Sequence, residues 1–228
     1  MSAVAQETEI RLTPLERIEQ LCDPGSFEAI RSRVMSGKLG GRARAGDGVV
    51  GGLGRVDGRP VAVYAQDASF LGGSLGAAHA ETIRRVMQLA GRSRVPVVGF
   101  IESGGARMQE GTAALAGYGR IFRQNVLLTG VVPQISVIGG LSAGGGCYSP
   151  ALTDFVVMTR HAAMFLTGPG VVRDVMGEDV TAADLGGYKV HERNGVTDLV
   201  VADDRAGAVA ARALLSYLPQ HAGGRLPR

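Results

Sequence analysis

Several residue types are scarce or missing in this sequence of 228 residues. Tryptophan is absent, and aromatic residues make up only 5% of the chain. The two cysteines, Cys22 and Cys147, stand far apart and have the spacing of neither a metal site nor a disulfide framework. We therefore expect no metal site, and thiols that stay reduced, as in a cytoplasmic protein.

Long apolar runs and basic stripes are missing as well. No uninterrupted apolar run reaches about 18 residues, and residues 1–21 lack the apolar core of a secretory signal, so we expect no membrane segment. The net charge is +3, but the basic residues are scattered and are not interleaved with aromatic residues. This pattern argues against a nucleic-acid-binding surface, whereas two or three such charges suffice for a phosphorylated small molecule.

Glycine, in contrast, is abundant. The chain has 35 glycines and no collagen-like period, while apolar residues make up 45% of it, so the glycines must serve folded backbone. The length suits one well-filled domain. We expect an N-terminal helical segment, residues 1–37, and a main domain, residues 38–228, that together form one structural unit.

The first third of the chain predicts helices followed by a hairpin. Thr13, which is followed by proline, is a helix start signal, and a break at Pro24 divides residues 13–35 into one or two short helices. A glycine-rich, basic loop follows. The turn signal at Asp57 then predicts an antiparallel hairpin between the strand-like segments VVGGLGRV and PVAVYAQD.

From His79 onward, helices and strands alternate. Residues 79–93 place apolar side chains at helical spacing, and the apolar run VPVVGFI follows as a strand. Next comes a helix through about residue 125, and the side chains expected on its buried face are Leu115, Tyr118, Phe122 and Val126. The alternation continues to a closing helix, AGAVAARALLSYL. This order indicates an α/β architecture with a sheet that is buried on both faces.

Two glycine-rich turns stand where a strand passes into a helix. They are Ser103-Gly104-Gly105-Ala106 and Ala143-Gly144-Gly145-Gly146. The first N–H groups of a helix have no internal partner, and glycine lets a ligand oxygen approach the backbone closely. Two such turns on successive strands can aim N–H groups at one developing oxyanion, as when a carbonyl becomes an enolate. Neither turn matches a nucleotide-binding loop, and from the residues alone tight packing is an equal alternative.

Long stretches of the sequence resemble a known family. The segments DASFLGGSLGAAHAETI, SGGARMQEGTAALAGYGRIF, VVPQISVIGGLSAGGGCYSPALTDFVVM and MFLTGPGVVRDVMGEDVTAADLGG are similar to the N-terminal half of the carboxyltransferase β subunits of biotin-dependent acyl-CoA carboxylases, of the propionyl-CoA and acetyl-CoA type. The similarity runs from about residue 14 to residue 219. It implies a ClpP/crotonase-like α/β fold, a spiral of stacked βαβ units, in which backbone N–H groups hold the carbonyl of an acyl-CoA thioester.

The resemblance also implies site residues. Gly104 and Gly105 look like the oxyanion turn, and Gly144 and Gly145 look like the glycines that face the thioester, so these four are the expected catalytic positions. The expected substrate-binding positions are Gly72, Gly73 and Gly76 of GGSLG, Ala106, Tyr148 and Ser149 of YSPAL, and Arg42 and Arg44 beside the CoA phosphates. Tyr148 either lines the acyl pocket or has its polar group hydrogen-bonded at a helix start.

Other polar side chains are expected to be structural. Arg107 is expected to pair with Glu110 or Glu102 and to hold its loop. His191 matches a histidine of the family pattern and is expected to make a structural hydrogen bond. Cys147 stands where the family has a small residue, so we expect a buried side chain rather than a catalytic thiol.

Three functions remain open at this level. The first is an acyl-CoA or acyl-carrier thioester carboxyltransferase half-subunit that works with a separate biotin-side half and a biotin carrier subunit. The second is a stand-alone, biotin-independent decarboxylase of malonyl- or methylmalonyl-type thioesters. The third is a non-catalytic acyl-CoA-binding subunit. The family's second half, which holds biotin, has no counterpart in this sequence, so carboxybiotin is expected only with a partner. Both enzymes would stabilise a thioester enolate without a side-chain nucleophile, and we expect a homo-oligomer.

Overall fold

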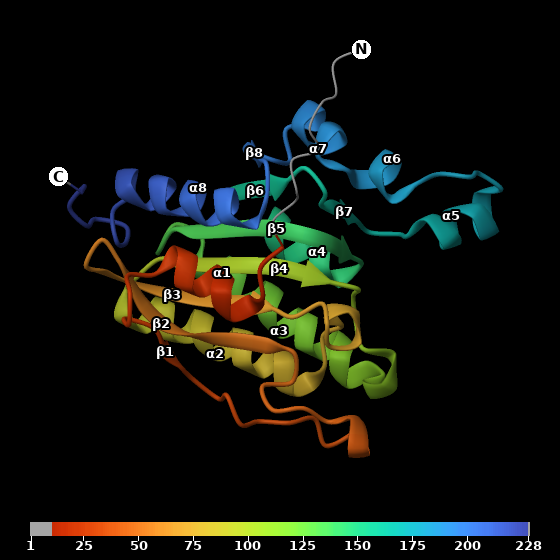
Figure 1. The fold of residues 1–228 in the computed structure, drawn as a ribbon, viewed down its shortest axis with the longest axis horizontal. Helices are drawn as coiled ribbons and strands as arrows, with labels where there is room; N and C mark the ends of the chain where they lie inside the picture. The colour runs from red at the N-terminus through yellow and green to blue at the C-terminus, as the bar shows by residue number, and fades with distance from the viewer. Residues whose placement is uncertain (1–10, 228) are drawn as a thin grey trace, which may run out of the picture.

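The fold is centred on one mixed β-sheet (Figure 1). The computed structural model describes residues 11–227, and residues 1–10 of the expected N-terminal segment lie outside them. Within the described residues, eight strands form the sheet, in the order β1-β2-β3-β4-β5-β6-β8, with β7 paired to β5. The strands are β1 (Glu28–Ala29), β2 (Val49–Val56), β3 (Arg59–Gln66), β4 (Val97–Ser103), β5 (Gln134–Ala143), β6 (Phe155–Thr159), β7 (Ala163–Phe165) and β8 (Leu199–Val201).

The sheet changes direction at β3. Strands β1, β2 and β3 pair antiparallel, and all later pairs are parallel. The predicted hairpin joins β2 to β3 through Asp57 and Gly58, whose φ angles are 50° and 74°. Positive φ at both central residues is what a tight hairpin turn requires. The hairpin and the alternating α/β order are therefore confirmed.

Helices cover both faces of the sheet (Figure 1). One buried cluster joins the sheet to α2 and α3, and a second joins its other face to α1 and α8. A smaller arm of α5, α6 and α7 extends beyond the sheet at the upper right of Figure 1. The helices are α1 (Pro14–Leu21), α2 (Ala77–Ser93), α3 (Thr112–Leu128), α4 (Gly145–Ala151), α5 (Pro169–Met176), α6 (Ala182–Gly186), α7 (Tyr188–Asn194) and α8 (Asp204–Tyr217), with short 3-10 turns η1 (Gly40–Arg42), η2 (Leu71–Gly73) and η3 (Met108–Glu110).

Of the one or two short helices expected over residues 13–35, only one forms. Helix α1 is capped by Thr13 and ends at Leu21, and the chain then turns into the edge strand β1. The carboxylate of Asp23 accepts hydrogen bonds from the N–H groups of Asp57 and Gly58 at 3.0 and 2.8 Å, which ties this turn to the hairpin. Proline and glycine after Asp23 prevent the helix from continuing.

The expected buried face of α3 is only partly right. Tyr118 is buried, but Leu115 and Val126 are 62% and 63% exposed. The face that packs on α2 centres on Gly117, where a Cβ atom would lie 2.7 Å from the Cβ of Ala80. Because close helix contact needs small side chains there, the large apolar residues turn outward. Helix α7 was not predicted at all.

Two kinds of feature are absent from residues 11–227. No helix there is long and apolar enough to cross a membrane. In the same part of the chain, no group of three or more histidine, cysteine, aspartate and glutamate side chains is placed to hold a metal ion.

Candidate active site

The two glycine turns lie side by side at the carboxyl ends of β4 and β5. A Cβ atom on Gly105 would lie 3.3 Å from the carbonyl oxygen of Ala143, and one on Gly146 would lie 3.2 Å from the Cβ of Ser103. Gly105 and Gly144 have φ angles of 96° and 56°, a region that side chains of other residues disfavour. The structure thus brings the two turns that the sequence singled out into direct contact.

The N–H groups of the first turn are already used in part. The N–H of Gly104 donates to the carbonyl of Gly72 at 2.8 Å, and the N–H of Gly105 donates to the Oγ atom of Ser103 at 3.2 Å. These bonds hold the turn against η2. The next donor along the chain, the N–H of Ala106, has no acceptor within the described residues.

In the second turn too, some N–H groups are bonded within the protein and others are free. The N–H of Gly144 donates to the carbonyl of Phe165 at 3.0 Å, which fixes the turn to β7. The N–H groups of Gly145 and Gly146, the first two residues of α4, have no acceptor in the described part of the chain. The free donors of the paired turns are therefore those of Ala106, Gly145 and Gly146. Of these three, the sequence analysis named Gly145 as catalytic and Ala106 as substrate-binding, and it singled out the turn of Gly146 without naming Gly146 as a site residue. The other three expected catalytic glycines, Gly104, Gly105 and Gly144, use their N–H groups within the protein.

The GGSLG segment packs directly against the first turn. A Cβ on Gly73 would lie 2.2 Å from the carbonyl oxygen of Glu102, so a larger residue would push β4 away. Gly76 lies elsewhere, since a Cβ there would lie 2.3 Å from Oε1 of Glu110 and 2.4 Å from a guanidinium nitrogen of Arg107. Gly72 and Gly73 thus adjoin the turns, whereas Gly76 makes room for an ion cluster.

That ion cluster is centred on Arg107. Its guanidinium contacts Oδ1 of Asp47 at 2.6 Å and Oε1 of Glu110 at 2.9 Å, and it donates to the carbonyl of Ser74 at 2.9 Å. The side chains of Arg107 and Asp47 are fully buried. The expected pairing with Glu110 is confirmed, the alternative Glu102 is not a partner, and Asp47 was missed. This ion cluster, called the Arg107 clamp below, holds together the loops that contain Asp47, Ser74 and Glu110.

Burial and hydrogen bonding set the protonation states around this clamp. Burial raises the pKa of Asp47 despite the neighbouring Arg107. Burial also acts on Glu110, but the N–H of Ala77 and the Arg107 charge hold its pKa below the usual value. Burial lowers the pKa of His79 to about 3, so the imidazole is neutral; its Nδ1 lies 3.1 Å from the carbonyl of Asp47 and donates to it.

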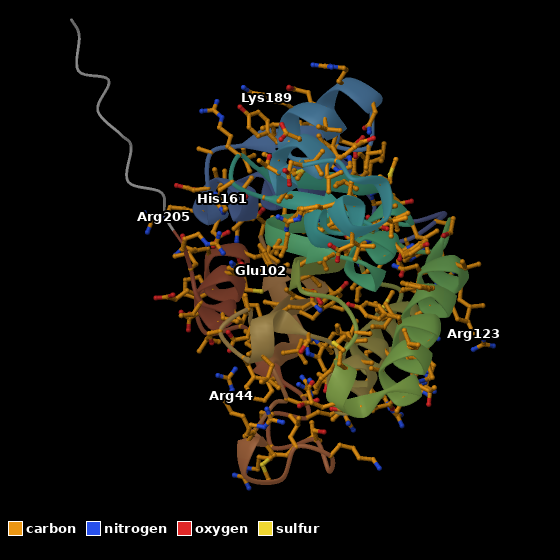
Figure 2. All side chains as sticks on the ribbon, turned by 90° about the vertical axis from the view of Figure 1, so that its right-hand side faces the viewer. Arg44, Glu102, Arg123, His161, Lys189 and Arg205 are labelled. Carbon is orange, nitrogen blue, oxygen red and sulfur yellow. The ribbon has the colours of Figure 1, made fainter. Side chains whose placement is uncertain are left out.

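A second buried cluster supports the end of β4. The carboxylate of Glu102 pairs with Arg17 at 2.7 Å and also with Arg11, and Arg17 pairs with Asp204 at 3.0 Å. A Cβ on Gly140 would lie 2.2 Å from Oε1 of Glu102, so this glycine leaves space for the carboxylate on the sheet. Figure 2, which faces the carboxyl ends of the central strands, shows Glu102 near the middle of this view. Helices α1 and α8 are thereby joined to the strand that carries the first turn.

The residues of YSPAL take different positions. The side chain of Tyr148 is half exposed and its ring lies 5.5 Å from that of Phe122. Ser149 is buried and donates to Oδ1 of Asn125 at 2.9 Å. Cys147 is buried and burial raises the pKa of its thiol, which confirms the expected inert cysteine. Only Tyr148 of the three presents its side chain to solvent.

The two arginines of the basic loop lie on the surface. Arg42 is exposed at the end of η1, and Arg44 pairs with Asp67 while its guanidinium stacks 4.5 Å from the centre of the Phe70 ring. Figure 2 shows Arg44 below Glu102, away from the centre of the face. The same Phe70 ring lies 5.3 Å from the guanidinium carbon of Arg107. The arginines thus border the loops of the site rather than contacting the turns.

His191 lies on the arm. Its Nε2 atom contacts the carbonyl of Met164 at 2.6 Å, which is the structural hydrogen bond expected from the sequence.

Comparisons with known proteins give a consistent result. The family model for the carboxyl transferase domain matches residues 5–227. The propionyl-CoA carboxylase beta chain of Cereibacter sphaeroides is 46% identical over 221 residues, which are 94% of this chain and 43% of that relative. The chain therefore spans less than half the length of such curated relatives.

Solved structures agree with the sequence comparisons. The crystal structure of transcarboxylase 12S with methylmalonyl-coenzyme A and methylmalonic acid bound has a TM-score of 0.91 and 44% identity, covering 95% of this chain and 43% of that one. A Pseudomonas malonate decarboxylase hetero-tetramer in complex with malonate has a TM-score of 0.81 and 27% identity, covering 89% of this chain and 81% of that one.

Proposed function

The chain belongs to the carboxyl transferase domain family of crotonase-like enzymes, and from this we propose that it is the acyl-CoA half of a carboxyltransferase. In this proposal the chain holds a CoA thioester and stabilises its enolate, and a separate subunit supplies the biotin side. The observation that carries the proposal is the pair of adjoining glycine turns, with free N–H groups on Ala106, Gly145 and Gly146.

The mechanism relies on backbone donors. The thioester oxygen accepts hydrogen bonds from the free N–H groups. These bonds strengthen as the α-proton passes to a solvent or buffer base, which is its acceptor when the biotin side is absent, and negative charge moves onto the thioester oxygen. One such donor typically contributes about 2.7–4 kcal/mol to transition-state stabilisation. The donors are held in place by the bonds of Gly104 and Gly144 to neighbouring carbonyls, so little reorganisation accompanies the reaction. No side-chain nucleophile is required, and the thiol of Cys147 is buried and protonated.

The other proposed contacts surround this centre. Gly72 and Gly73 let η2 approach the turn, and the exposed ring of Tyr148 borders the acyl group. Arg42 and Arg44 would meet the phosphates of CoA at the edge of the site. Ser149 and Gly76 act through packing, since both are turned toward buried partners.

In this proposal the biotin site needs a second chain. The two glycine turns form one group of donors, which the thioester oxygen would occupy, and a biotin ureido oxygen needs a second group. We propose that a partner half provides it and that a biotin carrier subunit delivers carboxybiotin there. No step above depends on biotin.

A biotin-independent decarboxylase is the second candidate. The same enolate forms when a malonyl- or methylmalonyl-type thioester loses CO2. The malonate decarboxylase neighbour supports this alternative, because it shows that a fold similar to this one, with a TM-score of 0.81, occurs in a decarboxylase. A non-catalytic acyl-CoA-binding subunit is the third candidate.

Association with other chains is part of the proposal. Helix α5 presents Val171, Val175 and Met176 to solvent at 53%, 78% and 65% exposure. An arm with such an apolar surface suits contact with a second chain.

The test uses a reaction that needs no biotin. Propionyl-CoA is incubated with the purified protein in D2O, and deuterium uptake at the α-carbon is followed by mass spectrometry, while malonyl-CoA and methylmalonyl-CoA are tested for loss of CO2. We expect α-exchange above the protein-free rate, because exchange requires the enolate. Loss of CO2 at a useful rate would favour the decarboxylase. CoA binding without exchange, with or without an added partner half, would leave the binding subunit and refute both enzymes.

A further inference from the structure

A groove between α2 and the residues after β1 lies outside the proposed thioester site. It encloses about 280 Å³. Its lining residues are Ile30, Arg31, Arg85, Gln88, Leu89 and Arg92. Four of them recur along α2 at helical spacing, while Val86, between them in sequence, packs on β2, where a Cβ of Gly51 would lie 2.9 Å from it. One face of α2 thus packs on the sheet and the adjoining face forms a wall of the groove.

The groove is strongly basic. Three guanidinium groups line it and no carboxylate does. Arg85 contacts Glu81 at 2.8 Å, but that carboxylate is shared with Arg84, which lies 2.5 Å from it. Hydrogen bonds to Arg84 are the main reason that the pKa of Glu81 is lowered to about 2, so its carboxylate is negatively charged and already pairs with Arg84. It leaves the positive charge of the groove largely uncompensated.

Two of the arginines have unused donors. Arg31 donates through Nε to the hydroxyl of Thr82 at 3.3 Å, which orients its side chain along α2. Neither Arg31 nor Arg92 has an ion-pair partner within residues 11–227. A guanidinium presents its donors as a planar fork that matches phosphate or carboxylate oxygens. Two guanidinium groups without an ion-pair partner, those of Arg31 and Arg92, therefore line the same groove.

The backbone at Arg31 is also unusual. Its φ angle is 55°, in the left-handed region that costs a residue with a side chain about 1 kcal/mol or more. Glycine would relieve that strain. An arginine in this conformation supports a role for the side chain in the groove that Arg92 also lines.

The groove is separate from the glycine turns. Helix α2 begins at Ala77, beside the site, and runs away from it. Arg85 and Arg92 lie 8 and 15 residues farther on, or roughly 12 and 22 Å along the helix axis. The groove also lies beside the residues that follow β1, the edge strand of the sheet, whereas the turns follow β4 and β5.

We propose that this groove binds a phosphate ester whose phosphate groups pair with Arg31 and Arg92. Ile30 and Leu89 provide apolar contact for the body of the ligand, and Gln88 offers a further polar group. A nucleotide-sized organic phosphate matches this combination of charge, apolar lining and volume. This site goes beyond the proposed reaction and does not depend on it.

The test is an NMR titration of the arginine Nε–H signals with adenosine diphosphate, pyrophosphate and adenosine at low salt. The double variant Arg31→Gln with Arg92→Gln removes both forks and their NMR signals, so its affinity is compared with that of the original protein by isothermal titration calorimetry. Arg33→Gln is the matched control from the same loop, outside the groove lining, and Arg44→Gln controls for binding at the proposed CoA phosphate position. All four substitutions are at partly or fully exposed side chains, so an unchanged melting temperature is expected and is measured first.

We expect saturable shifts of the Arg31 and Arg92 signals with adenosine diphosphate, weaker binding of pyrophosphate and none of adenosine. The double variant should bind at least tenfold more weakly, and Arg33→Gln should bind as the original protein does, whereas Arg44→Gln should weaken binding only at the proposed CoA phosphate position. The proposal is overturned if neither phosphate compound shifts these signals, if the double variant binds equally well, or if adenosine binds as tightly as its diphosphate.

Discussion

The clamp at Arg107 gives the sharpest prediction about stability. In Arg107→Met, a side chain of similar length fills the space but cannot pair with Asp47 or Glu110, whose side chains are 0% and 2% exposed. Removing one partner of a buried ion pair costs about 3–5 kcal/mol, because a buried charge is left without compensation. For a chain of this size each kcal/mol lowers the melting temperature by about 2–4 °C. We therefore expect a drop of roughly 6–20 °C at pH 8.

The sign of the pH dependence follows from the same groups. In the variant, both carboxylates are buried without a cation, so their folded-state pKa values rise above the unfolded values. The folded state then binds more protons than the unfolded state as the pH falls, and the loss of stability should shrink between pH 8 and pH 5.

Thermal and urea unfolding at the two pH values measure this effect. Arg84→Met is the matched control, since it breaks a partly exposed pair with Glu81 and should cost at most about 1 kcal/mol. The reasoning is refuted if Arg107→Met is as stable as the control at pH 8, or if its deficit grows toward pH 5.

Three further predictions concern the support of the glycine turns. Glu102→Gln removes one of the two buried carboxylates that pair with Arg17 and leaves the other, Asp204, so we expect a loss of about 1.5–3 kcal/mol in urea unfolding, and a change below about 1 kcal/mol would contradict the tie between α1 and β4. Gly73→Ala should lower the free energy of unfolding by more than about 2 kcal/mol, because its Cβ would lie 2.2 Å from a backbone oxygen. The control Gly25→Ala, with φ of 70° and open space around the Cβ, should lower it by only about 1 kcal/mol. Equal losses would argue against the close contact at Gly73. The thiol of Cys147 should react with iodoacetamide at pH 8 far more slowly in the folded protein than in urea, and equal rates would show that it is not buried.

Local signals in the sequence predicted much of the fold. The hairpin at Asp57 is recognisable because both turn residues suit positive φ, and the alternating order follows from periodicity. The buried face of α3 was mistaken, because the small residue Gly117 decides which side approaches α2, and that depends on the neighbouring helix. Likewise the segment after Leu21 became a strand by pairing with β2, which no local pattern specifies.

The site was predictable in position but not in its hydrogen bonds. The sequence placed both turns at strand ends, and parallel strands bring such ends together. Which N–H groups stay free depends on partners distant in the chain, such as Phe165 for Gly144. The same limit applies to Arg107 and Asp47, which are 60 residues apart. The spacing of residues along the sequence cannot predict a contact between residues so far apart.

The central claim is that free backbone N–H groups at the second turn stabilise a thioester enolate. Gly145 is the first residue of α4, where proline is compatible with a helix but has no N–H. A Cβ there meets the ring of Tyr118 at 2.6 Å, so Gly145→Ala carries the same steric change while keeping the donor.

The deciding measurement compares α-proton exchange of propionyl-CoA by the two variants, after their folding has been checked by thermal unfolding. Loss of one oxyanion donor typically lowers the rate about 10²- to 10³-fold. The account predicts that Gly145→Pro exchanges at least about 100-fold more slowly than Gly145→Ala, with both variants folded. Equal rates in the two folded variants would contradict it.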